Sequence, residues 1–520
     1  KVYAKDLQSI DFKDYWEKQD GDIDILVGYQ DLPEKQEQSP LYFKIDQTGH
    51  ILLVGSPGFG KSTFLRTFAI DIMRKKAPEE AHFYLYDFGA NGLVSLSDFP
   101  HVADYFTLDE NEKILKSLRR LNKMVKERKK ALSKIKATNL KQYNELSKDK
   151  FPSVFLLIDG FDGVTDSPFG DKLYDVLNVI ARDGASIGIY LVVTLSRLNT
   201  MRLQLQTNFK TKISLFLFDN SDLSGVVGRS NISLDEIKGR AITKLDNIVS
   251  FQVVLPYESE EYSNYIKSIN KEVKEMRSEY TGTLPEKIPM LPDVVKSEHL
   301  LSVFSNDNFV FGLEKEFVKP AFFSFNKAIL MAADGSSSIN NYYKLLDYNL
   351  KRLENQYNIV ILDLNKKVSE NLFKGANRFT SSSEIADVFK TIIKDLKERI
   401  NSKEVDYKKW LILIPEISPL VMSSDINEDD FKLLVTEGYK YGVIPIFVGE
   451  YLDLVNNTFD TYVSIVRKFV NQVFLGIRIS DQVHTRYPFI NNEPALKPNQ
   501  GYILYPDKYE LIQLMEIYDD

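Results

Sequence analysis

One pattern of apolar segments occurs twice in this 520-residue chain, and the repeat constrains its fold more than any other feature. A short apolar run over 50–54 leads into a glycine-containing turn, and a similar run leads into a second such turn about 280 positions later. The other matched pairs are 25–33 with 309–317, 83–93 with 359–368, 152–164 with 408–420, 181–194 with 435–449, and 210–218 with 470–478. Because order and spacing are kept, the sequence predicts a tandem duplication of one module.

The repeated segments are short apolar runs bounded by turn residues, which is typical of strands buried in a parallel sheet. Helix-length stretches separate them. In 113–136 the apolar residues recur on one helical face: Ile114, Leu118, Leu121, Val125, Leu132 and Ile135. This alternation predicts an α/β fold with two tandem modules, each a mostly parallel sheet flanked by helices.

A linker is predicted between the modules. Residues 276–295 contain three prolines and one glycine, which interrupt any regular element. We therefore expect a first module over 1–280, a linker over 281–293 and a second module over 294–520.

Composition excludes several classes of protein. The chain has no cysteine, which rules out disulfides, cysteine–metal sites and a cysteine nucleophile, and its five histidines are scattered. A net charge of −7 does not favour a nucleic-acid binder. No apolar run reaches the roughly 18–20 residues of a membrane helix. Since the chain begins at Lys1 and not Met, we expect a piece of a longer protein, with a membrane anchor upstream.

A phosphate-binding loop follows the first apolar run. Its sequence matches G-x-x-x-x-G-K-[ST] in full and precedes a helix-capable run over 63–73, as the motif requires. Glycines let the backbone N–H groups wrap an anion, Lys61 would neutralise the β- and γ-phosphates, and Ser62 would ligate Mg²⁺. The predicted nucleotide-binding residues are Gly55, Ser56, Pro57, Gly58, Phe59, Gly60, Lys61, Ser62 and Thr63.

The second magnesium-side group is predicted at the end of a later strand. The apolar run 154–158 ends in Asp159, 98 positions after Lys61. We expect Asp159 to act with Lys61 at the catalytic site and with Ser62 at the metal. Asp162 is a second acid nearby, but a surface turn is an equally good explanation for it.

Segments between these motifs resemble the FtsK/SpoIIIE-type motor ATPases, and most closely their EssC/EccC branch of type VII protein secretion. The resembling segments are the helix around 124–130 with Asn139 and Tyr143–Asn144, Asp87-Phe-Gly, 99–102, Arg182 to Ile189, Thr194 to Arg197, and 25–33 with Asp31 and Pro33. The resemblance implies RecA-like P-loop modules that use ATP and Mg²⁺, the last two ATPase modules of such a protein. It also implies sensor roles for Thr194, Ser196 and Arg197.

Two departures from the family bear on hydrolysis. The glutamate that usually follows the strand-end aspartate is Gly160, and the arginine-finger position is Ala185. A missing base costs about 10²–10⁴ in rate, and a missing finger about 10³–10⁵. Arg182 and Arg197 are nearby replacements, although structural ion pairing explains each better. We expect the first module to bind MgATP and to hydrolyse it slowly at best.

The second module has lost more of the motif. Its loop, 332–338, has no lysine; Asp334 would repel a phosphate, and Ser338 offers no charge. The strand-end aspartate is replaced by Pro415, while Glu416 stands at the catalytic-glutamate position. We expect this module to be inactive, with nucleotide binding left open.

The resemblance implies a secretion motor at the cytoplasmic face of the cell membrane, contributing to virulence. Its partners would be small helical WXG100-type substrates bound by the last module, other type VII membrane components, and further copies in a hexameric ring. A DNA translocase is one alternative, because 113–150 holds 14 Lys or Arg against three acids. A solvated helix face explains these charges better. A non-hydrolysing regulatory scaffold is the other alternative.

Overall fold

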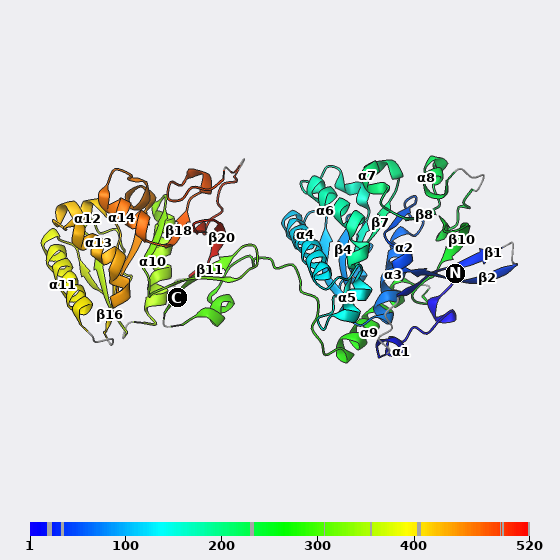
Figure 1. Cartoon of the computed structure of the whole chain (residues 1–520), viewed down its shortest axis with the longest axis horizontal. Helices are drawn as coiled ribbons and strands as arrows, with labels where there is room; N and C mark the ends of the chain where they lie inside the picture. Colours follow the sequence, from blue (N-terminus) through cyan, green and yellow to red (C-terminus); the bar gives the residue numbers. More distant parts are fainter. Residues whose placement is uncertain are drawn as a thin grey trace. The chain divides into compact units, whose positions relative to one another are not determined.

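The chain forms two compact units, Lys1–Ile288 and Pro289–Asp520 (Figure 1). The computed structural model describes residues 1–17, 23–32, 36–228, 233–259, 261–305, 307–353, 356–402, 407–488, 490 and 493–517. Pro33, one of the family-resembling residues, lies outside them. The division after Ile288 falls within the predicted linker. The start of the interrupted stretch is helical, since 276–279 ends α9 (Tyr262–Glu279).

The first unit is built on one sheet with the strand order β2-β1-β10-β9-β8-β3-β7-β6-β4-β5. The strands from β8 to β5 are parallel, and the strands from β9 to β2 extend the sheet in antiparallel pairing. The strands are β1 (Asp24–Leu32), β2 (Glu37–Lys44), β3 (Ile51–Val54), β4 (Ala81–Asp87), β5 (Val102–Thr107), β6 (Ser153–Asp159), β7 (Ile189–Leu195), β8 (Thr211–Leu215), β9 (Arg240–Lys244) and β10 (Ile248–Val253).

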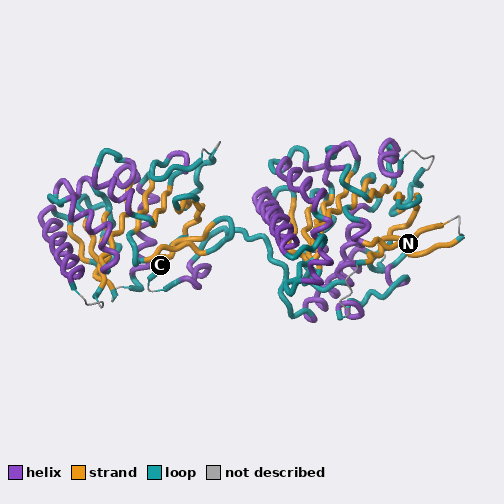
Figure 2. Tube along the Cα trace, in the orientation of Figure 1, coloured by secondary structure: helices purple, strands orange, loops and turns teal. Residues whose placement is uncertain are grey.

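Helices cover both faces of this sheet (Figure 2). One apolar cluster packs α4 and α6 against one face, and a second packs α3 and α9 against the other. Helix α4 confirms the predicted amphipathic helix, starting and ending two residues earlier than expected. The helices are η1 (Ala4–Asp6), α1 (Lys13–Trp16), α2 (Ile45–Thr48), α3 (Lys61–Lys75), η3 (Val94–Leu96), α4 (Asn111–Lys134), α5 (Leu140–Leu146), η4 (Phe161–Val164), α6 (Gly170–Asp183), η5 (Ala185–Ile187), η6 (Leu198–Thr200), α7 (Leu203–Gln206), η7 (Asn220–Asp222), α8 (Leu223–Val227) and α9.

The second unit repeats the sheet strand for strand. Its order, β12-β11-β20-β19-β18-β13-β17-β16-β14-β15, is that of the first unit with ten added to each number. The strands are β11 (Asn308–Glu314), β12 (Pro320–Ser324), β13 (Ile329–Ala333), β14 (Tyr357–Leu362), β15 (Asn377–Phe379), β16 (Lys409–Ile414), β17 (Val443–Glu450), β18 (Gln472–Gly476), β19 (Gln500–Leu504) and β20 (Tyr509–Leu514). The predicted tandem α/β fold is therefore confirmed.

Two further apolar clusters fill the faces of the second sheet. Helix α10 covers one face, and helices α11 to α14 cover the other. The helices are η8 (Ser297–Val303), α10 (Ser336–Leu350), α11 (Ser382–Asn401), α12 (Ser418–Ser423), α13 (Glu428–Glu437), η9 (Gly438–Tyr441), η10 (Leu452–Asn456), α14 (Thr461–Phe469) and η11 (Ile479–Asp481). Among the described residues, no helix combines the length and the apolar character that a membrane crossing demands.

Each unit buries one arginine that ties a long helix to the sheet. Arg128 of α4 donates to the carbonyls of Ile187 and Pro152, both at 2.8 Å. Arg399 of α11 makes the same bridge, to the carbonyls of Tyr441 at 3.0 Å and Lys408 at 3.1 Å. Burial lowers the pKa of Arg128 to about 10. The matching contacts make Arg128 and Arg399 equivalent positions of the repeat.

Buried histidines should make the first unit sensitive to acid. Burial lowers the pKa of His50 to about 4 and that of His101 to about 3. Below pH 6.5 these two histidines bind protons in the unfolded chain but stay neutral in the folded one. The folded state therefore loses stability, relative to its stability above pH 6.5, as the pH falls towards 4. Each histidine should cost about 2 kcal/mol of unfolding free energy between pH 6.5 and pH 5.

Urea unfolding at pH 7 and pH 5 measures this loss. His50→Asn and His101→Gln should each flatten the dependence on pH, whereas His299→Gln, at an exposed position, should leave it unchanged. A first unit equally stable at both pH values would contradict the assignment.

Candidate nucleotide-binding site

The phosphate-binding loop joins β3 to α3 at the carboxyl end of the parallel strands. Gly58 (φ 85°) and Gly60 (φ 109°) adopt the left-handed backbone that only glycine takes readily, and α3 begins at Lys61. The Lys61 ammonium donates to the carbonyl of Gly55 at 2.6 Å, so it reaches across the loop that it closes. Burial lowers the pKa of Lys61, and the nearby carboxylates of Asp159 and Asp162 oppose that shift.

The predicted metal-side residues meet directly. Ser62 Oγ lies 2.5 Å from Asp159 Oδ2, and Thr194 Oγ1 donates to Asp159 Oδ1 at 2.6 Å. Thr194 also accepts from the N–H of Gly160 at 2.9 Å. Both oxygens of the buried Asp159 are therefore oriented by hydroxyl groups. Two oxygen ligands beside a phosphate-binding loop suit Mg²⁺, which takes its remaining ligands from phosphate and water.

No complete protein-built metal cage accompanies this pair. Within the described ranges, no three side chains of His, Cys, Asp or Glu are grouped so that they could hold a metal. Magnesium at Ser62 and Asp159 would thus depend on the nucleotide. Metal and nucleotide binding by these residues both remain predictions.

The other candidate residues are dispersed. Asp162 accepts from the N–H of Ser196 and from Thr200 Oγ1, both at 2.8 Å, so it holds the turn after β7. Arg197 is exposed and lines a cavity of about 130 Å³ with Ser56. Among the described residues, Thr194 is the one sensor candidate whose side chain hydrogen-bonds to Asp159.

The arginine beside the arginine-finger position is already paired. Arg182 is exposed and forms an ion pair with Asp183, with Nη2 and Oδ2 2.8 Å apart. Ala185 is partly buried against the apolar cluster on the α3 side of the sheet. In this structure Arg182 thus pairs locally, as the sequence analysis favoured.

The backbone at Gly160 explains why a glutamate does not fit there. Gly160 is left-handed (φ 73°), and a Cβ atom at this position would lie 3.0 Å from the N of Gly89 and 3.3 Å from the carbonyl carbon of Phe88. A glutamate would therefore require both an unfavourable φ and a shift of the neighbouring loop. The missing base is a property of the local conformation as well as of the sequence.

Gly92 is a site residue that the sequence analysis missed. A Cβ atom at Gly92 would lie 2.6 Å from Asp159 Oδ2 and 2.6 Å from Ser62 Oγ, so the loop after β4 lies directly over the metal-side pair. Asp87 anchors this loop by accepting from the N–H of Leu93 at 2.8 Å. The two glycines of Gly89-Ala-Asn-Gly92 were a visible signal, but only the fold shows what they approach.

Gly92→Ala should weaken MgATP binding at least tenfold, because the added methyl group intrudes on the metal-side oxygens. Gly89→Ala is the matched control, since its Cβ would have nothing nearer than Asp87 Oδ1 at 4.0 Å. Titration calorimetry with and without Mg²⁺ measures the effect. Equal affinities for Gly92→Ala and Gly89→Ala would remove Gly92 from the site.

In the second module, the residues that correspond to the end of the phosphate-binding loop form the first turn of a helix. In the first unit, Asp71 of α3 accepts a hydrogen bond from the N–H of Leu26. In the second unit, Asn349 of α10 accepts one from the N–H of Val310. The two contacts are equivalent, so Asp71 aligns with Asn349. By this alignment the lysine position is Ile339, which is buried, and not Ser338. Helix α10 starts at 336, three residues before the position where α3 starts. As the sequence analysis expected, the second loop has no lysine at this position.

The remaining acids of the second module are arranged differently from the first. Asp334 is exposed, and Pro415, directly after β16, stands at the position of Asp159. Glu416 is buried, and within the described part of the chain its Oε1 has no hydrogen-bond partner. At the positions of Lys61 and Asp159 the second module therefore has Ile339 and Pro415, which supply neither a cation nor a carboxylate.

Comparison with known proteins agrees with this geometry. The sequence model of the FtsK/SpoIIIE family matches residues 14–233. The type VII secretion system protein EssC of Staphylococcus aureus (strain NCTC 8325 / PS 47) is 34% identical over 518 residues, 98% of this chain and 35% of that protein. Residues 14–233 of the first unit belong to the FtsK/SpoIIIE family. P-loop ATPases of this family bind nucleotide, usually with Mg²⁺.

Solved structures extend the similarity to both units. EssC (ATPases 2 and 3) from Geobacillus thermodenitrificans matches with a TM-score of 0.83 at 25% identity, covering 95% of this chain and 96% of that one. EccC (ATPases 2 and 3) of Thermomonospora curvata, solved with a signal sequence peptide, shares the fold at a TM-score of 0.56 and 19% identity, covering 96% and 94%. The chain is thus homologous to EssC proteins of type VII secretion systems over almost its whole length, and it spans about a third of the length of these curated relatives.

Proposed function

We propose that this chain is the cytoplasmic-face ATPase portion of a type VII secretion motor, and that its first module binds MgATP. The meeting of Ser62 and Asp159 under an intact phosphate-binding loop supports the nucleotide role. Turnover by this chain alone is slow, because Gly160 supplies no base and Ala185 no finger. In the full protein, association into a ring and with other membrane components of the system would complete the site.

The first unit also binds an extended segment of its own linker. Arg120 of α4 donates to the carbonyls of Glu286 at 2.7 Å and Lys287 at 3.0 Å. The N–H of Ile288 donates to Asp104 Oδ2 of β5 at 2.9 Å, and the Ile288 side chain is buried in the α4–α6 cluster. The sheet edge formed by β5 and α4 therefore accepts an extended peptide through its backbone and one apolar side chain.

The equivalent edge of the second module carries uncharged polar side chains that can hydrogen-bond to a peptide backbone. With Arg128 aligned on Arg399, Arg120 corresponds to Thr391 of α11. The parallel pairing of β14 with β15 places Asn377 at the position of Asp104. Thr391 and Asn377 are both exposed. We infer that this edge binds an extended segment of another chain, the signal of a small helical WXG100-type substrate. The signal peptide in the Thermomonospora curvata structure is consistent with this proposal.

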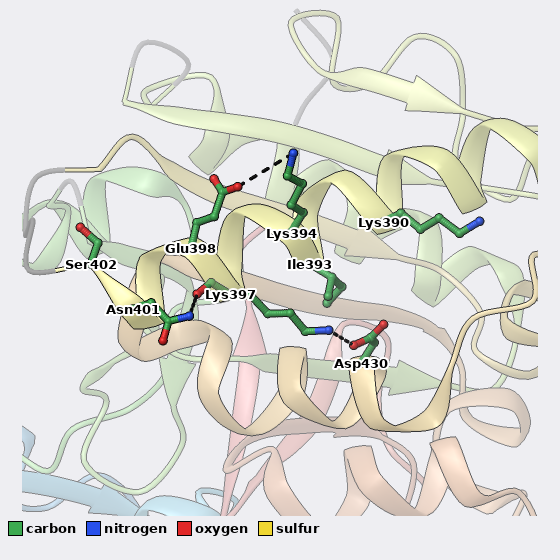
Figure 3. A pocket seen from close by; sticks show the side chains of 8 residues that line it. All are labelled: Lys390, Ile393, Lys394, Lys397, Glu398, Asn401, Ser402 and Asp430. Carbon is green, nitrogen blue, oxygen red and sulfur yellow. Dashed lines mark hydrogen bonds and ion pairs between the residues drawn. The ribbon is translucent and has the colours of Figure 1, made fainter.

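Binding of a labelled substrate signal peptide to the whole chain tests the recognition role. Thr391→Trp should block the β15–α11 edge and weaken binding at least tenfold. Lys397→Trp is the matched control, on the side of α11 that faces α13. There Lys397 forms an ion pair with Asp430 at 2.7 Å beside a lysine-lined cavity of about 570 Å³ (Figure 3). Equal affinities for the two variants would reject this edge as the peptide site. If the chain is only a regulatory scaffold without substrate recognition, the wild type would show no peptide binding.

A further inference from the structure

Three phenylalanines gather beside the phosphate-binding loop. Phe59, within the loop, contacts Phe216 (ring centroids 4.6 Å apart) and Phe218 (5.7 Å). Phe216 and Phe218 follow β8 and meet edge to face at 5.4 Å. Phe59 is buried, whereas Phe218 is 72% exposed. We propose that Phe218, supported by Phe59 and Phe216, is the surface on which the purine base of the bound nucleotide stacks. This inference rests on the proposed nucleotide binding and extends it to the base.

The position of β8 favours the base end of the nucleotide. In the sheet, β3 lies between β8 and β7, and Asp159 comes from β6 on the β7 side. The metal and the terminal phosphate therefore belong to the β7 side of the loop. The nucleoside end must leave the loop elsewhere, and the chain emerging from β8 borders the other side.

Hydrogen bonds hold the aromatic group in register with the loop. The N–H of Phe218 donates to Ser56 Oγ at 3.0 Å, and the N–H of Ser56 donates to the carbonyl of Phe216 at 2.9 Å. The carbonyl of Phe59 accepts from the N–H of Gly239 at 3.0 Å. The ring of Phe218 is thus an exposed apolar surface with an anchored backbone. The cavity of about 130 Å³ beside it is lined by Ser56, Pro57 and Arg197.

The second module provides an internal comparison. Since Ile51 pairs with Thr211 as Ile329 pairs with Gln472, the positions of Phe216 and Phe218 correspond to Ile477 and Ile479. Both isoleucines are buried. Phe216 and Phe218 therefore have aliphatic counterparts in the module without the intact loop. A purely structural role would not require the exposed ring.

Calorimetric titration of the whole chain with MgATP and with magnesium tripolyphosphate tests the inference. Tripolyphosphate engages the loop but has no base. Phe218→Ala should weaken MgATP binding about tenfold, in line with base–aromatic stacking, and leave tripolyphosphate binding unchanged. Phe218→Trp should retain the MgATP affinity. Leu203→Ala on α7, also 72% exposed before substitution, should change neither affinity.

The opposing outcomes are distinct. Unchanged MgATP affinity in Phe218→Ala would overturn the stacking role, as would an equal loss for tripolyphosphate. A changed sedimentation coefficient with unchanged MgATP affinity would assign Phe218 to a contact between copies and also overturn it. If the wild-type chain binds neither ligand, the proposed nucleotide binding itself fails, and the stacking role fails with it.

Discussion

Lys61→Ala is expected to lower the affinity of the chain for MgATP by about 100-fold or more, the usual cost of removing a charge partner from a partly buried site. The ammonium already sits inside the loop, 2.6 Å from the Gly55 carbonyl, where the phosphates would replace that carbonyl as its partner. Alanine would leave the loop backbone facing the anion without a balancing charge. Titration calorimetry of the whole chain with ATP and Mg²⁺ measures the change.

The matched control is Lys123→Ala, which removes a lysine from the exposed face of α4. It should bind MgATP like the wild type. Equal affinity in Lys61→Ala and Lys123→Ala would contradict the site. Rapid ATP hydrolysis by the unmodified chain, lost in Lys61→Ala, would support the site but contradict slow turnover.

Arg128→Met is expected to lower the unfolding free energy of the first unit by about 4 kcal/mol, because it leaves buried carbonyls without donors. The carbonyls of Ile187 and Pro152 would each lose a charge-assisted hydrogen bond. Methionine keeps much of the side-chain volume, so the loss reports the polar contacts and not a cavity. Urea denaturation followed by circular dichroism measures it.

Two variants control this measurement. Lys126→Met makes a similar change on the exposed face of the same helix and should cost less than about 0.5 kcal/mol. Arg399→Met should destabilise the second unit by a similar amount and leave the first transition in place. A loss below about 1 kcal/mol in Arg128→Met would show that water can replace the guanidinium.

Most of the architecture could be predicted because it depends on patterns local to each segment. Strand-length apolar runs, helix-length spacers and turn residues predicted two copies of one α/β module, and the sheets have matching orders. The residue that corresponds to Lys61 in the second loop could not be identified from the sequence, for a physical reason. Residues 336–338 are serines, which suit a loop and the first turn of a helix equally, so only the fold could show that α10 starts there.

At the site, the sequence identified residues that a motif names, and the structure brings Lys61, Ser62 and Asp159 together at one end of the sheet. It could not identify Gly92 or Phe218. Their relevance depends on which loops meet across strands far apart in the chain, and no spacing rule encodes that meeting. The sequence shows that Gly160 replaces the usual glutamate, but only the structure shows that the backbone conformation there disfavours a glutamate.

The early start of α10 has a consequence for repairing the second module. Restoring lysine at 339 alone would extend a cation from an ordinary helix, without the encircling N–H groups that make such a lysine useful. To bind phosphate, the second module would also need a later helix start, glycines at two positions of the loop and an acidic residue at position 415. Building a phosphate-binding loop at this place would therefore take several simultaneous substitutions.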